Sequence, residues 1–424
     1  AVIITLYQIH GNYGILKGDW LDPNAIITPH NPRAPISRNM TEIKFIPTER
    51  LYQDIGATMM PRLERLYSGA IQGEGSGHCG SRHFADQYTQ RCEAHINEIT
   101  GRRHTFLTTS GTASIQLMLM AVGVGPGDEV ICTNYSCPAT VMPIRLLGAR
   151  PIFVDLDPYG QQDLAQVASR VTPRTRAVMV TDLYGDCSDY DQLGSIDLPV
   201  LNDSAQSLMT LYRGRQTASI GDMSIQSFST NKNCPIFGTY GAISTDDDGL
   251  AERIQVMRKN GYGNREVGTA IHHIGINAHP QEDKAVQVLC SLERLAGWQL
   301  RRAEIAQRLT ERLRSAGVQI RPSPAYSETN HHKFSIFVSD KRQFRDLMTQ
   351  RGVETQLHYT YNFARTRVLS DNTEQHMPMT EFYARHAISI PSNPWLTDQE
   401  VDRVAEAVKS CVTDKDLETR IPGL

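Results

Sequence analysis

From about residue 83 onward, short apolar runs alternate with helical stretches, and this alternation constrains the fold more than any other feature of the sequence. Strands and helices in alternation produce a mainly parallel sheet that is covered by helices on both faces. We therefore expect an α/β fold with a seven-stranded sheet. Its strands are expected at 105–109, 129–133, 151–155, 177–181, 199–202, 224–228 and 241–244, with a helix at 112–122 after the first of them.

The same pattern predicts three regions. Residues 1–39 lack periodicity and end in a proline-marked stretch, which predicts an irregular N-terminal extension. Residues 40–280, with N-terminal helices, would form the large domain, and 281–424 would form linking helices and a smaller α+β domain. In this last region we expect helices at 281–316, 342–351 and 398–409 and strands at 333–338 and 354–359.

The net charge of −3 is spread along the chain, which does not favour binding to a nucleic acid or an anionic membrane. No apolar run approaches the roughly 20 residues of a transmembrane helix, and the first residues lack the basic start of a secretory signal. We expect a cytoplasmic protein. The eight cysteines are scattered and are interpreted as free thiols, and the adjacent histidine pairs lack the further ligands of a metal site.

Small and hydroxylated residues stand where the first strand turns into the first helix. Gly111 and Thr112 leave backbone N–H groups open to an anion, and the positive end of the helix dipole favours its binding. The stretch is therefore a candidate phosphate cradle. Ser110 alone would equally serve as an ordinary helix N-cap.

Two charged residues follow later strands. Asp203 ends one strand and can act as a helix N-cap or as an anion that faces a ring nitrogen, and Lys232 follows another. Most lysines are solvated, but one that is buried beside a second cation loses its charge and becomes a nucleophile. The carboxyl ends of strands in an open α/β sheet meet at one crevice. There the three segments would supply what pyridoxal 5'-phosphate (PLP) needs.

From about Ile46 to Val412 the sequence resembles the DegT/DnrJ/EryC1/StrS family of PLP-dependent sugar aminotransferases, which have the aspartate aminotransferase (type I) fold. The matched motifs occur in the family's order. They are Ser-Gly-Thr-Ala at 110–113, the stretches 125–131 and 148–155, Asn-Asp-Ser-Ala-Gln at 202–206, Ser-Phe-x-x-x-Lys-Asn at 227–233, Gly-Ile-Asn at 275–277, and the stretches 357–359 and 390–394.

The resemblance implies roles around the cofactor ring. Lys232 would be the catalytic residue and form the Schiff base, Asp203 would face the pyridine nitrogen, and Gln206 would lie near the 3'-oxygen. Cys137 stands where the family commonly has an aromatic ring that stacks on the cofactor, and it would pack there with less area.

The resemblance also implies phosphate and substrate contacts. The cofactor phosphate would contact Gly111, Thr112 and Ser227. Asn277 would reach the cofactor phosphate of the neighbouring subunit, which implies a homodimer with shared active sites. The matched stretch at 357–359 implies that His358 and Tyr359 line the substrate site. His358 can equally be a structural histidine.

The function that the resemblance implies is amino transfer from an amino acid, expected to be glutamate, to a keto-sugar, with PLP cycling through pyridoxamine 5'-phosphate (PMP). A nucleotide-linked keto-deoxysugar is the expected acceptor, and a keto-cyclitol or a sugar phosphate of antibiotic biosynthesis is an alternative. A PLP-dependent sugar dehydratase is a second alternative, but such relatives commonly replace the lysine by histidine, and Lys232 is present. A protein without catalytic activity is a third, which the nearly complete cofactor site disfavours.

Overall fold

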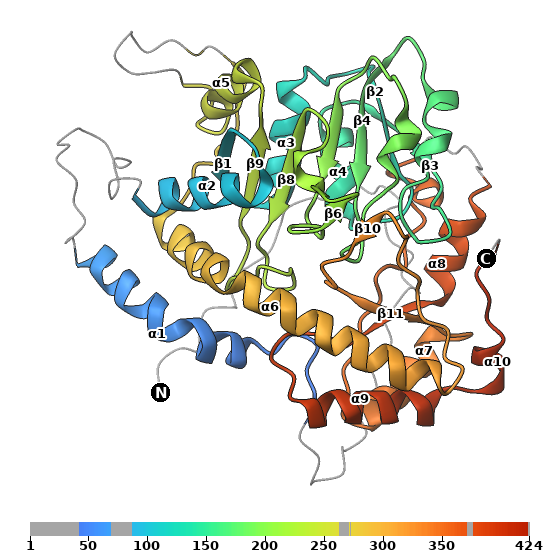
Figure 1. Cartoon of the computed structure of the whole chain (residues 1–424). Coiled ribbons are helices and arrows are strands. Elements are labelled where there is room, and N and C mark those ends of the chain that lie inside the picture. Colours follow the sequence, from blue (N-terminus) through green and yellow to red (C-terminus); the bar gives the residue numbers. More distant parts are fainter. Residues whose placement is uncertain (1–41, 69–86, 263–270, 272, 371–375, 423–424) are drawn as a thin grey trace, which may run out of the picture. The chain divides into compact units, whose positions relative to one another are not determined.

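Seven strands form the central sheet in the order β1-β9-β8-β5-β4-β2-β3 (Figure 1). Neighbouring strands run parallel from β8 to β3, whereas β9 runs antiparallel to both β1 and β8. The sheet is thus mainly parallel, as the sequence predicts. The strands are β1 (His104–Thr108), β2 (Glu129–Thr133), β3 (Arg150–Val154), β4 (Thr175–Thr181), β5 (Val200–Asp203), β8 (Met223–Ser227) and β9 (Gly241–Thr245).

Our computed structural model describes residues 42–68, 87–262, 271, 273–370 and 376–422. The predicted extension at 1–39 lies outside the described residues. The elements described below all belong to the unit that spans Thr41–Leu424.

Side chains of the strands alternate between two apolar layers. Val130 and Met179 point into a cluster with α3 (Gly111–Ala121), α4 (Pro138–Leu146) and α5 (Asp248–Met257). On the opposite face, Leu107 and Ala242 pack against α2 (Gln87–Thr100) and the first half of α6 (Glu282–Arg314). Figure 1 shows α2 and α6 on the other side of the sheet from α3 and α4. Two-sided burial of this kind explains the almost uninterrupted apolar character of the parallel strands.

A third apolar cluster holds the C-terminal elements together. The second half of α6, through Ile305 and Leu309, packs against β11 (Phe334–Phe337) and β12 (Ala387–Ile390), which pair antiparallel. The helices of this region are α7 (Lys341–Gln350), α8 (Pro378–His386), α9 (Asp398–Cys411) and α10 (Asp414–Leu417).

The N-terminal helix α1 (Thr48–Tyr67) lies along α6 (Figure 1). The Asp54 carboxylate of α1 accepts hydrogen bonds from the indole N–H groups of Trp298 at 2.7 Å and Trp395 at 2.9 Å. These two indole rings meet edge to face with their centres 5.2 Å apart. Asp54 therefore joins α1 to α6 and to the segment after β12.

The predicted strand at 354–359 is wrong. Only Gln356 pairs with Ser389, as an isolated bridge, and β12 already occupies the edge of β11. Beyond the bridge the chain turns toward the large sheet, where the Tyr359 amide donates to the Tyr135 hydroxyl. Three short strands that the sequence did not predict form a separate small sheet: β6 (Leu211–Tyr212), β7 (Arg215–Gln216) and β10 (Ser327–Glu328).

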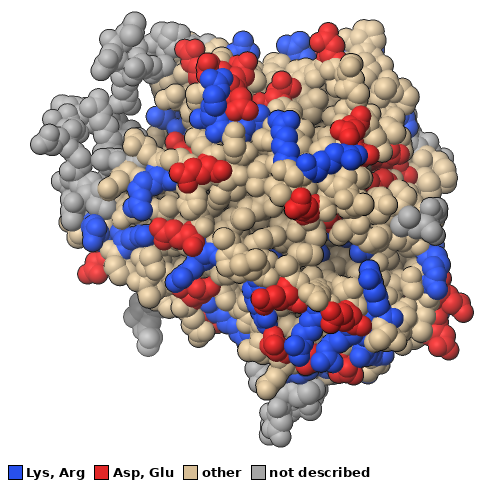
Figure 2. All heavy atoms as spheres, viewed as in Figure 1, with Lys and Arg blue, Asp and Glu red and all other residues tan. Residues whose placement is uncertain are grey.

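Acidic and basic side chains are interspersed on the face seen in Figure 2. Along α6 and α9, for example, Arg301 pairs with Asp398, and Arg308 pairs with Asp402. No helix among the described residues is both long and apolar enough to cross a membrane. The seven described cysteines are unpaired thiols, six of them buried.

Candidate active site

The turn between β1 and α3 lies against the end of β8. Ser110 caps α3 by accepting a hydrogen bond from the Ala113 amide at 3.1 Å. A Cβ at Gly111 would be crowded, because it would lie 3.0 Å from Ser227 Cβ and 3.1 Å from its Oγ. Thr112 is exposed. The first turn of the helix and the Ser227 hydroxyl thus border one small space, which suits a phosphate group.

Asp203 is the last residue of β5, and its carboxylate is buried. It accepts hydrogen bonds from Thr140 Oγ1 at 2.9 Å and from the Ala205 amide at 3.2 Å. Burial raises the pKa of the Asp203 carboxyl, and the charge of Lys232 and the two hydrogen bonds oppose that rise. An anion buried with so few partners is suited to face a cationic group.

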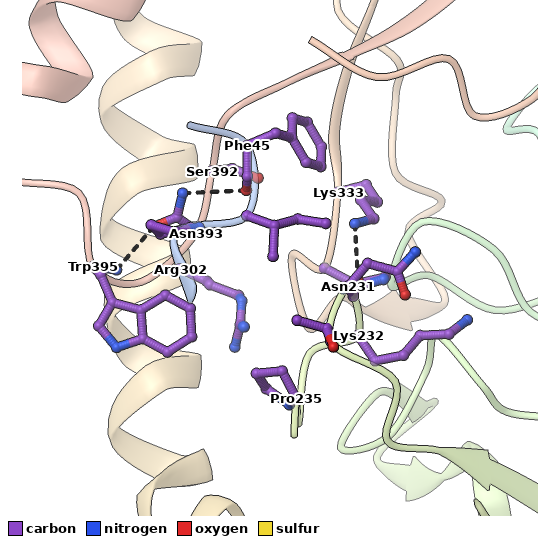
Figure 3. A pocket seen from close by; sticks show the side chains of 13 residues that line it. Phe45, Asn231, Lys232, Pro235, Arg302, Lys333, Ser392, Asn393 and Trp395 are labelled. Atoms are coloured by element: carbon purple, nitrogen blue, oxygen red, sulfur yellow. Dashed lines mark hydrogen bonds between the residues drawn. The ribbon is translucent and has the colours of Figure 1, made fainter. Parts of the chain in front are cut away.

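Lys232 lies in the loop after β8, with its stem partly exposed. Burial lowers the pKa of its amine, while Asp203 and Cys137 oppose the shift. The neutral amine is a nucleophile and a base. The stem borders a pocket, and the amine points away from Arg302 on the pocket's other side (Figure 3).

The Gln206 amide is fixed on two sides. Its Oε1 accepts a hydrogen bond from the Tyr184 amide at 2.9 Å, and its Nε2 donates to the Tyr359 hydroxyl at 2.9 Å. The Tyr184 hydroxyl in turn donates to the carbonyl of His358 at 2.6 Å. One N–H of Gln206 remains for a ligand atom.

Two further predicted residues lie close to Lys232. Cys137 is the N-cap of α4 and is partly buried. His358 is buried, and its Nδ1 lies 3.0 Å from Ser389 Oγ. Burial, with the charges of Lys333 and Lys232, lowers the pKa of His358 well below its usual range, so the ring is neutral.

Among the described residues of a single chain, Asn277 does not lie with the residues around Lys232. Its side chain is exposed, and its backbone bridges to Lys259. A side chain at Gly275 would collide with the backbone at Gly261 and Met257, 2.4 Å away, which explains why glycine starts this turn.

Several residues of the site lie outside the motifs that predict it from the sequence. Thr140 holds Asp203, and Tyr184 holds Gln206. Arg302 and Lys333 line the pocket beside the Lys232 stem. Helical spacing was the one available signal for Arg302, because it stands four residues after Trp298 and three before Ile305, both of which are buried.

Comparison with known proteins identifies what the chain resembles. The sequence profile of the DegT/DnrJ/EryC1/StrS aminotransferase family matches residues 81–409. The UDP-2-acetamido-2-deoxy-3-oxo-D-glucuronate aminotransferase of Pseudomonas aeruginosa is 28% identical, over 74% of this chain and 88% of its own. The dTDP-3-amino-3,4,6-trideoxy-alpha-D-glucose transaminase of Streptomyces venezuelae is 30% identical, over 72% of this chain and 82% of its own.

Solved structures share the fold. DesV of S. venezuelae superposes with a TM-score of 0.79 at 26% identity, covering 88% of this chain and 98% of that one. NtdA of Bacillus subtilis, which contains bound PMP, gives 0.76 at 24% identity, with coverage of 89% and 86%. The predicted family and the predicted type I fold are therefore confirmed.

Proposed function

Because this chain belongs to the DegT/DnrJ/EryC1/StrS aminotransferase family, we propose that it transfers an amino group from an amino acid, with glutamate as the expected donor, to a nucleotide-linked keto-sugar. The chain is a PLP-dependent aminotransferase, and the cofactor alternates between PLP and PMP. Relatives named for UDP- and dTDP-linked sugars support the choice of acceptor. The observation that carries the proposal is the Lys232 amine, whose pKa burial lowers and which shares one site with the Asp203 carboxylate.

The residues present fit the cofactor. The first turn of α3 at Gly111 and the neighbouring Ser227 hydroxyl can hold the phosphate, and Asp203 can hold the ring nitrogen in its protonated form. Gln206 keeps an N–H for the 3'-oxygen. When bound, PLP supplies an electron sink for the carbanion of the substrate.

The remaining chemistry falls to the chain itself. Because burial favours the neutral form of Lys232, its Nζ can accept a proton from the α-carbon of the donor and return it as an acid. Thr140 and the Ala205 amide orient the Asp203 carboxylate and favour its ionised form. Tyr184 and Tyr359 fix Gln206, so the groups that would contact the cofactor ring are positioned before substrate binds.

We also propose a homodimer in which Asn277 of one subunit contacts the cofactor phosphate of the other. Its exposed side chain, on a turn tied to Lys259 and packed closely at Gly275, supports this proposal. Sedimentation of the purified enzyme tests the dimer.

The test of function uses purified holoenzyme, glutamate and a panel of keto-sugar acceptors. We expect 2-oxoglutarate and an aminated nucleotide sugar in equal amounts, and we expect neither from Lys232→Ala. The protein-bound PLP absorbance band should survive dialysis in the wild type and be lost in this variant. If only a keto-cyclitol or a sugar phosphate is aminated, that compound replaces the nucleotide-linked keto-sugar as the acceptor. Sugar dehydration without formation of 2-oxoglutarate would exclude amino transfer.

A further inference from the structure

Two buried cations beside the Lys232 stem lack a carboxylate partner in the part of the chain that the structure describes. Arg302 on α6 is 3% exposed, and Lys333, just before β11, is 8% exposed. Among the described residues, Arg302 Nη1 has no hydrogen-bond partner. The Lys333 amine donates to the Asn231 carbonyl at 3.1 Å and lies 4.9 Å from the centre of the Phe45 ring. Neither contact neutralises a charge.

Other buried arginines of the described chain are paired. Arg321 pairs with Asp186, Arg258 with Glu93 and Arg102 with Asp246. A buried charge without a partner is costly, so a fold that pairs these three and leaves two cations together has a site for an external anion.

Burial disfavours the charged form of both side chains, and for Arg302 it outweighs the opposing effect of Cys234. Burial lowers the pKa of Arg302 to about 10. Burial, with the charges of Lys232 and Arg302, lowers the pKa of Lys333 well below its usual range. A bound anion would reverse both shifts and favour the protonated forms.

The pocket that both cations line suits a ligand with an anionic group and an apolar part. Its lining also includes the apolar surfaces of Phe45, Pro235 and Trp395. Figure 3 shows Arg302 extending into it from α6, and the Lys232 amine directed to the other side. A ligand that binds Arg302 through an anionic group would therefore carry that group several bonds away from the atom that reaches the Lys232 amine. The part of the ligand between them would be apolar.

We propose that Arg302 and Lys333 bind the side-chain carboxylate of an acidic amino donor, glutamate or aspartate, and so determine donor specificity. This inference rests on the proposed function, because it assumes that an amino acid reacts at Lys232. The methylene groups of the donor would pack on the apolar lining, and its α-carbon would come within reach of the Lys232 amine, as the proposed proton transfer requires.

The test follows the donor half-reaction alone, as the loss of the PLP absorbance band after mixing holoenzyme with glutamate or with its uncharged isostere glutamine. In Arg302→Gln and Lys333→Gln, we expect the glutamate concentration at half-maximal rate to rise roughly ten- to hundredfold, because a hydrogen bond to a charged group is lost. The glutamine value should change less than threefold. Lys333→Arg keeps the cation and should recover most of the preference.

A direct binding measurement needs no turnover. Calorimetric titration of the holoenzyme with glutarate should give binding in the wild type that weakens at least tenfold in both glutamine variants. Lys284→Gln is the matched control, because that lysine also donates to a backbone carbonyl, that of Phe237, but lies outside the pocket lining. It should bind glutarate like the wild type.

The outcomes are distinguishable. Unchanged glutamate and glutarate affinities in both variants would overturn the inference, and so would a defect confined to the sugar half-reaction, which would assign the cations to the acceptor. If glutarate binding is lost in the two variants but the wild type aminates no sugar, the carboxylate subsite stands and the proposed acceptor is rejected. Each cation is replaced separately, so a variant that fails to fold leaves the other as the test.

Discussion

Thr140→Val should shift the pH dependence of cofactor binding upward. The Asp203 carboxylate has two hydrogen-bond donors among the described residues, Thr140 Oγ1 at 2.9 Å and the Ala205 amide at 3.2 Å. Valine has nearly the shape of threonine but cannot donate, so the carboxylate keeps one donor. A hydrogen bond to a charged group contributes about 1.5–3 kcal/mol, and one pKa unit corresponds to about 1.36 kcal/mol. The Asp203 pKa should therefore rise by roughly 1–2 units.

The direction of the pH shift follows from which protonation form of Asp203 would hold the cofactor. In the proposed site the ionised carboxylate would face the ring nitrogen, and the population of this form falls as the pH drops through the Asp203 pKa. A higher pKa in the variant thus moves the loss of PLP affinity to higher pH. Titration of cofactor-free enzyme with PLP at a series of pH values measures the midpoint. Thr140→Ser keeps the hydroxyl and should show the wild-type midpoint, and a Thr140→Val midpoint equal to or below that of the wild type would refute the reasoning.

Two other predictions concern packing and buried charge. Gly111→Ala should weaken PLP binding at least tenfold, because the added Cβ meets Ser227 at 3.0 Å, whereas Gly125→Ala, with open space around it, should not; equal affinities would exclude the cradle. Burial raises the pKa of Asp182 to about 7. Since its unfolded pKa is about 3.9, the free energy of unfolding should fall as the pH rises from about 4 to 7, and Asp182→Asn should flatten this fall in urea unfolding. An identical slope in that variant would show that Asp182 does not titrate there.

The sheet could be predicted from the sequence because its strands are buried on both faces. Their apolar runs stand out between turns, and the predicted limits of β2 at 129–133 are exact. The segment 354–359, Glu-Thr-Gln-Leu-His-Tyr, has no such apolar run, and the strand predicted there does not form. A hydrogen bond from its last residue to Tyr135, 224 positions away, draws it aside, and no local pattern contains that partner.

The site was predictable only where a residue belongs to a motif. Asp203 and Lys232 stand in such motifs at strand ends, and the structure brings them together. Lys333 follows two histidines at the start of a predicted strand and belongs to no motif that indicates a function. Arg302 stands in an arginine-rich helix in which Arg301 and Arg308 keep much more of their side-chain surface exposed. Which arginine is buried depends on how α6 packs, and that is a property of the tertiary structure.

The indole pair held by Asp54 gives the molecule an internal optical probe. Two of the three tryptophans in the sequence, Trp298 and Trp395, share one carboxylate, and Trp395 also lines the pocket that Arg302 and Lys333 enter. Their emission depends on the electric field and on the water around the rings. Ligand arrival in this pocket can therefore be followed by intrinsic fluorescence, without a dye and before any bond is made.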